Sequence, residues 1–181
     1  YKCYGVSWTE DDRILCAMSN QIEVRGAIPQ LERTIRFPAT HIIFSAVMIH
    51  RKLYTKTGNA ATKKYITYCG SLDEPTQTVL HSEEDKNPDR INHISANKEC
   101  MASFDYANKA LKMFSSINNE HLFDIQLTGM KQPYGVHLTS DGVLVTDWEG
   151  ENMSKYSLSP SDESLWTCNG PREPSGITTD E

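Results

Sequence analysis

Short runs in which apolar and polar residues alternate, separated by turn residues, follow one another along the chain. The clearest example is residues 133–148, where two such runs flank the turn Ser140-Asp141-Gly142. Alternation with a period of two predicts β-strands that bury one face, and the turn between them predicts a hairpin. No apolar run approaches the ~20 residues that a membrane-spanning helix needs, so no membrane partner is expected. The pattern therefore predicts an all-β protein.

The hairpin pattern recurs at intervals of about 40 residues. Shifts of 41 or 42 residues, and of 130, align the glycine near its start, and the Asp and aromatic residue at its end, with similar residues elsewhere in the chain. The aligned pairs are Gly135 with Gly5 and with Gly176, Asp147 with Asp105, and Trp148 with Tyr106. A repeat of this length, made of short strands, is typical of a β-propeller whose blades are four-stranded antiparallel sheets.

About four blades can be delimited. Their expected limits are residues 1–37, 38–90, 91–129 and 130–170, and a further blade begins within 171–181. An incomplete, open propeller would expose the edges of its sheets, so we expect further residues to complete it. The blade at 38–90 is the longest, and we assign its extra length to a segment at 57–63, with a turn at 57–59, and to an acidic loop at 82–89. Such insertions are tolerated because loop-closure entropy grows slowly with length.

The net charge of −6 conceals one strongly basic stretch. Between Arg33 and Leu72 the chain holds seven cationic residues and no Asp or Glu. Cations can bind phosphates and tyrosines can stack on the bases of single-stranded RNA, which makes RNA a candidate partner. An acidic protein surface, or water alone, would suit the same cations. The candidate residues of this basic 51–68 segment are Arg51, Lys52, Tyr54, Lys56, Lys63 and Lys64.

The residue types that often carry catalysis show no catalytic or metal-binding spacing. The five cysteines form no C-x-x-C pair, and the six histidines form no metal-ligand motif. We therefore expect no metal, no cofactor, no small-molecule substrate and no catalytic residue within this chain. A propeller hydrolase is retained as an alternative, because some propellers bind a metal on their central axis. Scattered cysteines are typical of reduced thiols, which predicts a cytoplasmic location.

The repeated carboxylates and glycines have a structural interpretation. An Asp at the entry to a tight loop can accept hydrogen bonds from backbone N–H groups two residues on, which fixes the loop. We expect this role at Asp105 and Asp147. We also expect a hairpin turn at Asp141 and Gly142, in which the glycine has a positive φ. Turn roles are likewise expected at Gly5, Gly135 and Gly176.

Three aromatic residues near these loops are candidates for binding a partner. Tyr106 and Trp148 occupy the same loop position in adjacent blades, and Tyr134 lies at the start of the fourth blade. Aromatic residues with polar neighbours are typical anchors of protein interfaces. The alternative is that the rings pack between blades. A protein partner is accordingly the first functional hypothesis.

Residues 135–147 read Gly-Val-x-x-Thr-x-Asp-Gly-x-x-x-Thr-Asp, which resembles the NHL repeat. NHL repeats are propeller blades at the C-terminal end of many tripartite-motif (TRIM) ubiquitin ligases. Residues 133–156 fit this repeat well, 91–115 and 1–25 in part, and 38–80 poorly. The resemblance implies a six-bladed propeller that recognises substrates of a TRIM-type E3 ubiquitin ligase, whose chemistry would lie in a RING segment elsewhere. It also supports the RNA alternative, because some NHL propellers bind RNA.

Overall fold

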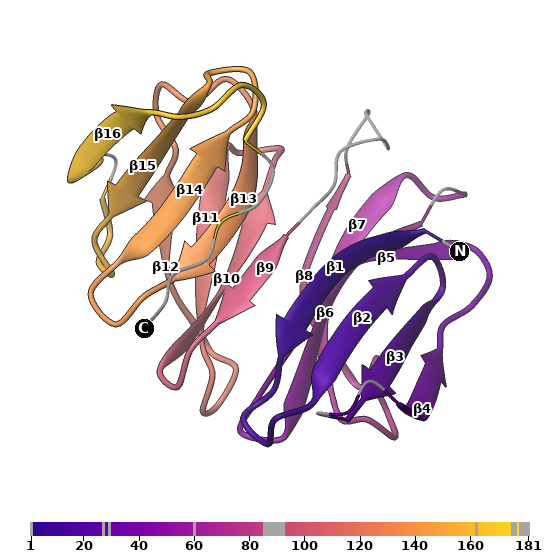
Figure 1. The fold of residues 1–181 in the computed structure, drawn as a ribbon. Coiled ribbons are helices and arrows are strands. Elements are labelled where there is room, and N and C mark those ends of the chain that lie inside the picture. The colour runs from indigo at the N-terminus through magenta and orange to yellow at the C-terminus, as the bar shows by residue number, and fades with distance from the viewer. Residues whose placement is uncertain are drawn as a thin grey trace. The chain divides into compact units, whose positions relative to one another are not determined.

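The computed structural model confirms the all-β class, because the residues that it describes form four four-stranded antiparallel sheets and no helix (Figure 1). These residues are 2–26, 28, 30–59, 61–84, 93–161, 163–174 and 177. In every sheet the four strands follow the order of the chain, as in the blade of a propeller. The chain divides into two compact units, Tyr1–Ile94 and Ser95–Glu181. Across the described ranges, no helix is long and apolar enough to cross a membrane.

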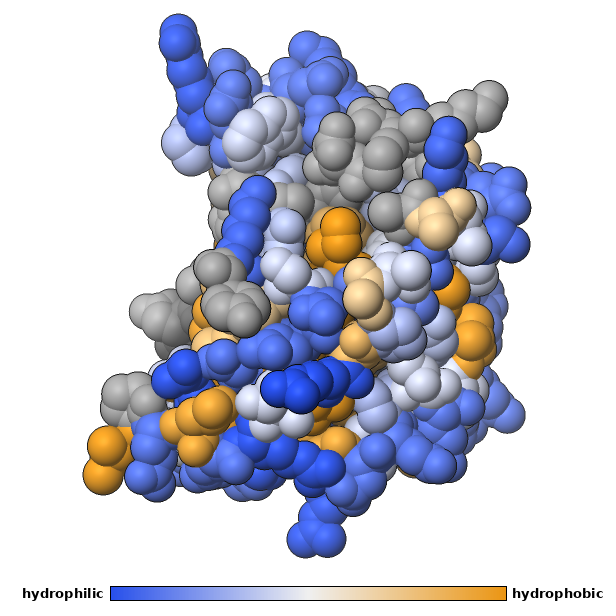
Figure 2. All heavy atoms as spheres, turned by 90° about the vertical axis from the view of Figure 1, so that its right-hand side faces the viewer, coloured by the Kyte–Doolittle hydropathy of each residue, from blue (hydrophilic) through white to orange (hydrophobic). Residues whose placement is uncertain are grey.

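The first unit consists of two blades. Blade 1 contains β1 (Cys3–Trp8), β2 (Ile14–Met18), β3 (Gln21–Arg25) and β4 (Leu31–Arg36). Blade 2 contains β5 (His41–Ile49), β6 (Lys52–Asn59), β7 (Lys64–Gly70) and β8 (Thr78–Glu84). Figure 2 shows the molecule from the right-hand side of Figure 1, where hydrophobic residues appear as separate spots among hydrophilic ones.

The second unit is also built from two blades. Blade 3 contains β9 (Ile94–Ala96), β10 (Cys100–Asp105), β11 (Ala110–Ser115) and β12 (His121–Gln126). Blade 4 contains β13 (Pro133–Leu138), β14 (Val143–Asp147), β15 (Asn152–Tyr156) and β16 (Trp166–Asn169). Each strand pairs with the strand that follows it in the chain, so each blade is an antiparallel meander.

One apolar core lies between the two blades of each unit. Alternate residues of a strand share one face, so the second and third strands of one blade can pack against the first and second strands of the next. In the first unit the core includes Leu15, Ala17, Ile22 and Val24 from blade 1, and Ala46, Met48 and Leu53 from blade 2. In the second unit it includes Ala102, Phe104, Leu111 and Met113 from blade 3, and Val136, Leu138, Val143 and Val145 from blade 4.

Backbone pairing shows that blades 1, 2 and 4 are equivalent position by position. In each, the register between the first two strands slips near the start of the first strand, at Cys3/Gly5, Ile43/Ser45 and Pro133/Val136. Counted from this slip, the pair Trp8–Ile14 corresponds to Met48–Leu53 and to Leu138–Val143. The repeat seen in the sequence is therefore a repeat of hydrogen-bond register.

Two details of blade 2 differ from expectation. Residues 57–59, expected as a turn, form the end of β6 and pair with 41–43 at the start of β5. Residues 82–84, expected in an acidic loop, form the end of β8 and pair with 64–66 of β7. Backbone hydrogen bonds extend β6 and β8 beyond the residues in which apolar and polar side chains alternate, because the backbone pairs regardless of side chain. Residues 85–90 of that loop lie outside the described part of the chain.

Candidate interaction surface

Asp147 ends β14 and is completely buried. Its carboxylate accepts hydrogen bonds from the backbone N–H groups of Lys131 and Gln132, both at 2.8 Å, and of Gly150 at 3.0 Å. The loop that enters β13 and the loop that follows β14 are therefore joined through one side chain. Because the carboxylate is buried among backbone donors, it controls loop geometry.

Trp148, the next residue, forms an aromatic pair with Tyr134 of β13. The ring centroids are 5.1 Å apart, the planes are inclined by 33°, and both side chains are half-buried. The backbone N–H of Trp148 donates to the carbonyl oxygen of Gln132 at 2.9 Å, so the tryptophan is tied to the same loops as Asp147. Burial raises the pKa of the Tyr134 phenol, which keeps this ring neutral. The pair is thus a partly exposed aromatic surface with a fixed backbone beneath it.

Tyr106 does not contribute to this surface, which corrects its assignment as a binding residue. Its side chain is only 7% exposed, its ring lies 5.3 Å from that of Phe104, and its hydroxyl donates to the carbonyl oxygen of Pro133 at 2.9 Å. The ring of blade 3 therefore packs under the first strand of blade 4. This is the alternative in which the ring lies between blades, and it holds because the polar tip finds a backbone acceptor there.

Asp105 occupies in blade 3 the position that Asp147 occupies in blade 4. It is 1% exposed, and its carboxylate accepts the backbone N–H of Asn108 at 3.1 Å and the side-chain amide of Asn108 at 2.9 Å. The ammonium of Lys112 lies 3.5 Å from the same carboxylate. Asp105 is thus held among groups of its own blade, as a residue that fixes a loop.

The turn at Asp141 and Gly142 is present, but its geometry differs from expectation. The hydroxyl of Thr139 donates to Asp141 at 2.9 Å, and the Lys155 ammonium lies 2.8 and 2.7 Å from the two carboxylate oxygens. The hydrogen bonds from Lys155 and Thr139 lower the pKa of Asp141. Gly142 does not adopt a positive φ, whereas Gly129 does. The position requires glycine because a Cβ would lie 2.7 Å from the carbonyl oxygen of Tyr156.

Two of the other repeated glycines, Gly5 and Gly135, lie in strands and not in turns. Gly5 belongs to β1, where an added Cβ would lie 3.0 Å from the carbonyl oxygen of Phe44 in blade 2. Gly135 belongs to β13, and its N–H donates to the hydroxyl of Thr146 at 2.8 Å. Close approach between strands therefore explains the glycine at Gly5. Gly176 lies outside the described residues.

The basic 51–68 segment does not form one continuous patch. Arg51 and Lys52 lie at the turn between β5 and β6, whereas Lys63 and Lys64 lie at the turn between β6 and β7. These turns are at opposite ends of β6, which separates them by roughly 23 Å at about 3.3 Å per residue. Lys64 also forms an ion pair with Glu84 at 3.5 Å.

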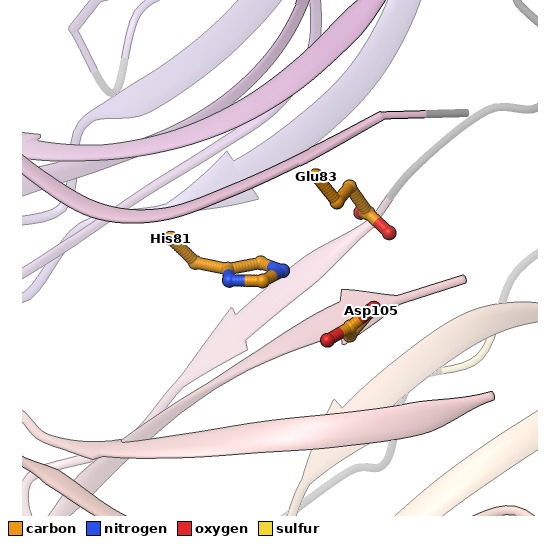
Figure 3. Close-up of side chains that lie close together, drawn as sticks. All are labelled: His81, Glu83 and Asp105. Atoms are coloured by element: carbon orange, nitrogen blue, oxygen red, sulfur yellow. The ribbon is translucent and has the colours of Figure 1, made fainter. Parts of the chain in front are cut away.

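Two residues of that segment are buried, which corrects their assignment to a binding surface. The Lys56 ammonium forms an ion pair with Glu83 at 2.9 Å, and the two side chains are 0% and 2% exposed. Tyr54 is also completely buried, and this burial raises the pKa of its phenol far above the usual value. Figure 3 shows Glu83 with His81, which projects from the same strand, β8. Lys56 and Tyr54 therefore stabilise blade 2 from within.

One exposed apolar surface was not predicted from the sequence. Val6 and Trp8 of β1 are both 65% exposed. Their spacing of two residues places them on one face of the strand, and this spacing was the available signal.

The comparisons with known proteins identify the fold. No family model and no curated protein sequence matches the chain, so the resemblance to NHL repeats gains no support from them. Among solved structures, a protein of unknown function from Bacteroides caccae has a TM-score of 0.62 and 16% identity, covering 93% of this chain and 61% of that one. BamB from Moraxella catarrhalis has a TM-score of 0.60 and 10% identity, covering 95% of this chain and 52% of that one. The chain therefore has the fold of a β-propeller with four-stranded blades and spans little more than half the length of these proteins.

Proposed function

We propose that this propeller segment is a non-catalytic protein-interaction module whose partner docks on the Tyr134–Trp148 pair. The observation that carries the proposal is that both rings are half-buried and stand over loops held by Asp147 and by the Trp148 backbone. A partner meeting rings that are already ordered loses little side-chain entropy on binding. Large aromatic side chains also supply much of the contact energy at the centre of protein interfaces.

The polar neighbours of the pair suit the rim of such an interface. Lys131 and Glu149 are exposed. Lys131 directly precedes Gln132, whose backbone is held by Asp147 and by Trp148, and Glu149 directly follows Trp148. Polar, solvent-accessible residues around an apolar centre are the usual composition of a protein interface. Charges of both signs are present, so we expect a partner of mixed charge.

RNA is the less suitable partner. Binding of a single strand requires a continuous basic groove with exposed aromatic rings along it. Here the cations Arg51 and Lys63 lie at opposite ends of β6, while Tyr54 and Lys56 are buried. A single strand would meet no basic groove among the residues of blade 2 that the structure describes.

We further propose that the partner is a substrate of a TRIM-type ubiquitin ligase and that binding takes place in the cytoplasm. The support for the ligase is the resemblance of residues 133–156 to an NHL blade, and the support for the compartment is that the cysteines are free thiols. Proteins that bind the chain should carry more ubiquitin in cells that express the full-length protein than in cells that express its Trp148→Ala form. Equal ubiquitin in the two would remove the ligase hypothesis while leaving the interaction module intact.

The interaction itself is tested by capture with matched tryptophan variants. The immobilised chain is incubated with cell lysate, and retained proteins are quantified by mass spectrometry for the parent, Trp148→Ala and Trp166→Ala. Trp166 of β16 is 42% exposed and lies in the outer strand of the same blade, so it controls for the loss of an exposed aromatic ring. We expect a set of proteins retained by the parent and by Trp166→Ala but lost with Trp148→Ala. Retention of the same set by all three proteins would contradict the proposal.

A further inference from the structure

Three sulfur-containing residues of blade 1 lie on one face of its first two strands, and we call them the sulfur cluster: Cys3, Cys16 and Met18. Cys3 of β1 is the cross-strand partner of Met18 of β2. Cys16 lies on the same face as Met18, because side chains two residues apart in a strand point to the same side. All three residues belong to paired strands of one sheet, so the register of these strands determines how they lie relative to one another.

The Cys3 thiol is directed toward Cys16. It donates to the carbonyl oxygen of Gly5 at 3.5 Å, so it leans along β1 toward Val6, which is the cross-strand partner of Cys16. Burial raises the pKa of the Cys16 thiol, and the nearby Cys3 raises it further. Diagonal neighbours in an antiparallel pair have Cα atoms about 7–8 Å apart, which allows two cysteine side chains to share one bound ion.

The sulfur cluster is not part of the framework that the blades share. In the common register of blades 1, 2 and 4, its three positions are taken by other residues, which are Ile43, Thr55 and Thr57 in blade 2 and Pro133, Val145 and Asp147 in blade 4. None of these residues contains sulfur. The fold of a blade therefore does not require sulfur at these positions, and a role specific to blade 1 can explain it.

We propose that the sulfur cluster binds one soft monovalent cation, Cu(I), through the thiolates of Cys3 and Cys16 and the thioether of Met18. Thiolate and thioether sulfur are the ligands that select Cu(I) in proteins. On binding, the two thiols release their protons to solvent and the copper stays Cu(I), so no electron is transferred. No metal was expected from the sequence, because strand pairing and not motif spacing brings these ligands together. The site uses residues that the proposed interaction module does not use.

The surroundings of the sulfur cluster suit Cu(I) better than zinc. A structural zinc site has four ligands in a tetrahedral arrangement, drawn from thiolates, imidazoles and carboxylates. The carboxylate next to the cluster in the register is that of Glu23, the cross-strand partner of Cys16. It already accepts hydrogen bonds from the Arg25 guanidinium at 3.0 Å and from the Gln21 amide at 3.2 Å. Among the described residues of blade 1, the cluster therefore offers three soft ligands to a metal ion.

Competition for copper tests the proposal on the full chain. With the thiols reduced and oxygen excluded, the chain is titrated into the coloured Cu(I) complex of bicinchoninate, and the loss of colour measures the copper that the chain withdraws. We expect the parent to withdraw one equivalent of Cu(I). Cys3→Ser and Cys16→Ser should each weaken the affinity by more than about 100-fold, because each removes a charged ligand. Met18→Leu keeps the side-chain volume and should weaken it by about tenfold.

Cys168→Ser is the matched control, and its affinity for Cu(I) should equal that of the parent. Cys168 of β16 is the cross-strand partner of Met153 of β15, and these two strands contain no second cysteine. An equal loss of affinity in Cys168→Ser and Cys16→Ser would overturn the proposal.

X-ray absorption at the copper edge tests the parent directly, so that the result does not depend on the folding of any variant. We expect three sulfur neighbours around the copper. Nitrogen or oxygen neighbours in their place, failure of the parent to withdraw copper from bicinchoninate, or displacement of the copper by an equal concentration of Zn²⁺ would each overturn the proposal.

Discussion

Blade 4 and blade 2 end their second strands, β14 and β6, in different ways. In blade 4 the register slip leads to the pair Pro133–Asp147, and the buried Asp147 carboxylate then holds three backbone N–H groups. In blade 2 the equivalent pair is Ile43–Thr57, and no carboxylate is available at that position. There the two strands continue for two more pairs, up to His41 with Asn59. In blade 2, backbone pairing therefore covers the positions at which blade 4 has loops held by the Asp147 side chain.

The turn chemistry nevertheless returns, displaced by two residues. The side-chain oxygen of Asn59 accepts the N–H groups of Ala61 at 3.0 Å and of Thr62 at 3.2 Å. Asp147 accepts Gly150 and Asp105 accepts Asn108 in the same way, from three residues further on. A strand that ends in a tight turn needs an acceptor for the N–H groups of that turn, and Asn or Asp supplies it. Equivalence between blades therefore lies in hydrogen bonding more than in residue number.

A second contrast concerns buried charge. Blade 4 places Thr146 at the position that Ala17 has in blade 1, whereas blade 2 places Lys56 there and pairs it with Glu83. The cation that made blade 2 look like a surface for ligands is thus part of its interior. Breaking such a pair is costly because one charge stays buried without its partner.

The largest effect is expected from breaking this pair. Lys56→Met leaves Glu83 buried without its cation, and we expect the free energy of unfolding of the first unit to fall by about 3–5 kcal/mol. Urea unfolding followed by circular dichroism measures it. Lys64→Met is the matched control, because its pair with Glu84 is largely exposed, and we expect a change of about 0–1 kcal/mol. The double variant Lys56→Met/Glu83→Leu should recover most of the loss, and a further loss instead would contradict this interpretation.

The next effect is expected at the closing carboxylate of blade 4. Asp147→Ala removes the acceptor of three backbone N–H groups, and we expect a loss of about 3 kcal/mol in the stability of the second unit. Hydrogen exchange at Lys131, Gln132 and Gly150 should become faster, and Trp148 fluorescence should report a looser loop. At the equivalent position of blade 2, Thr57→Val should cost less than about 1 kcal/mol. Similar losses in both variants would refute the contrast between the two blades.

A smaller effect is expected at the displaced turn of blade 2. Asn59→Ala removes the acceptor for Ala61 and Thr62, and we expect a loss of about 1 kcal/mol. Asn59→Asp retains an acceptor oxygen and should be close to the parent in urea unfolding. If the aspartate variant loses as much stability as the alanine variant, hydrogen bonding does not explain the role of Asn59.

The smallest effect is expected at the exposed turn of blade 4, and it depends on pH. The folded pKa of Asp141 lies below its ordinary value of 3.8, because Lys155 and Thr139 donate to the carboxylate. Its contribution to stability is therefore complete above about pH 4 and is lost as the pH falls through the folded pKa. Asp141→Asn should lower the urea midpoint slightly at about pH 7 and leave it unchanged at about pH 2. An equal difference at both pH values would rule out the carboxylate charge as the cause.

The sequence predicted the blades well because their evidence is local. Alternation identifies each strand, and the spacing of Gly135, Asp147 and their counterparts identifies the repeat. The prediction was less accurate where two residues that look alike in the sequence pack against different surroundings in the fold. Tyr106 and Trp148 are aligned, yet Tyr106 packs under Pro133 while Trp148 stays half exposed. Lys56 and Lys64 looked alike as cations, yet only one lies in the interior.

The sequence by itself determined most of the secondary structure of the described residues: their short strands, their arrangement in four blades and two acceptors of turns, Asp105 and Asp147. These features depend on residues a few positions apart, where backbone geometry and side-chain alternation decide the outcome. The tertiary structure alone decided which faces are covered. Burial of Lys56 and Tyr106, and exposure of Val6 and Trp8, depend on what packs against each side of a sheet. A strand has two faces, and its own sequence does not determine which neighbour packs against each of them.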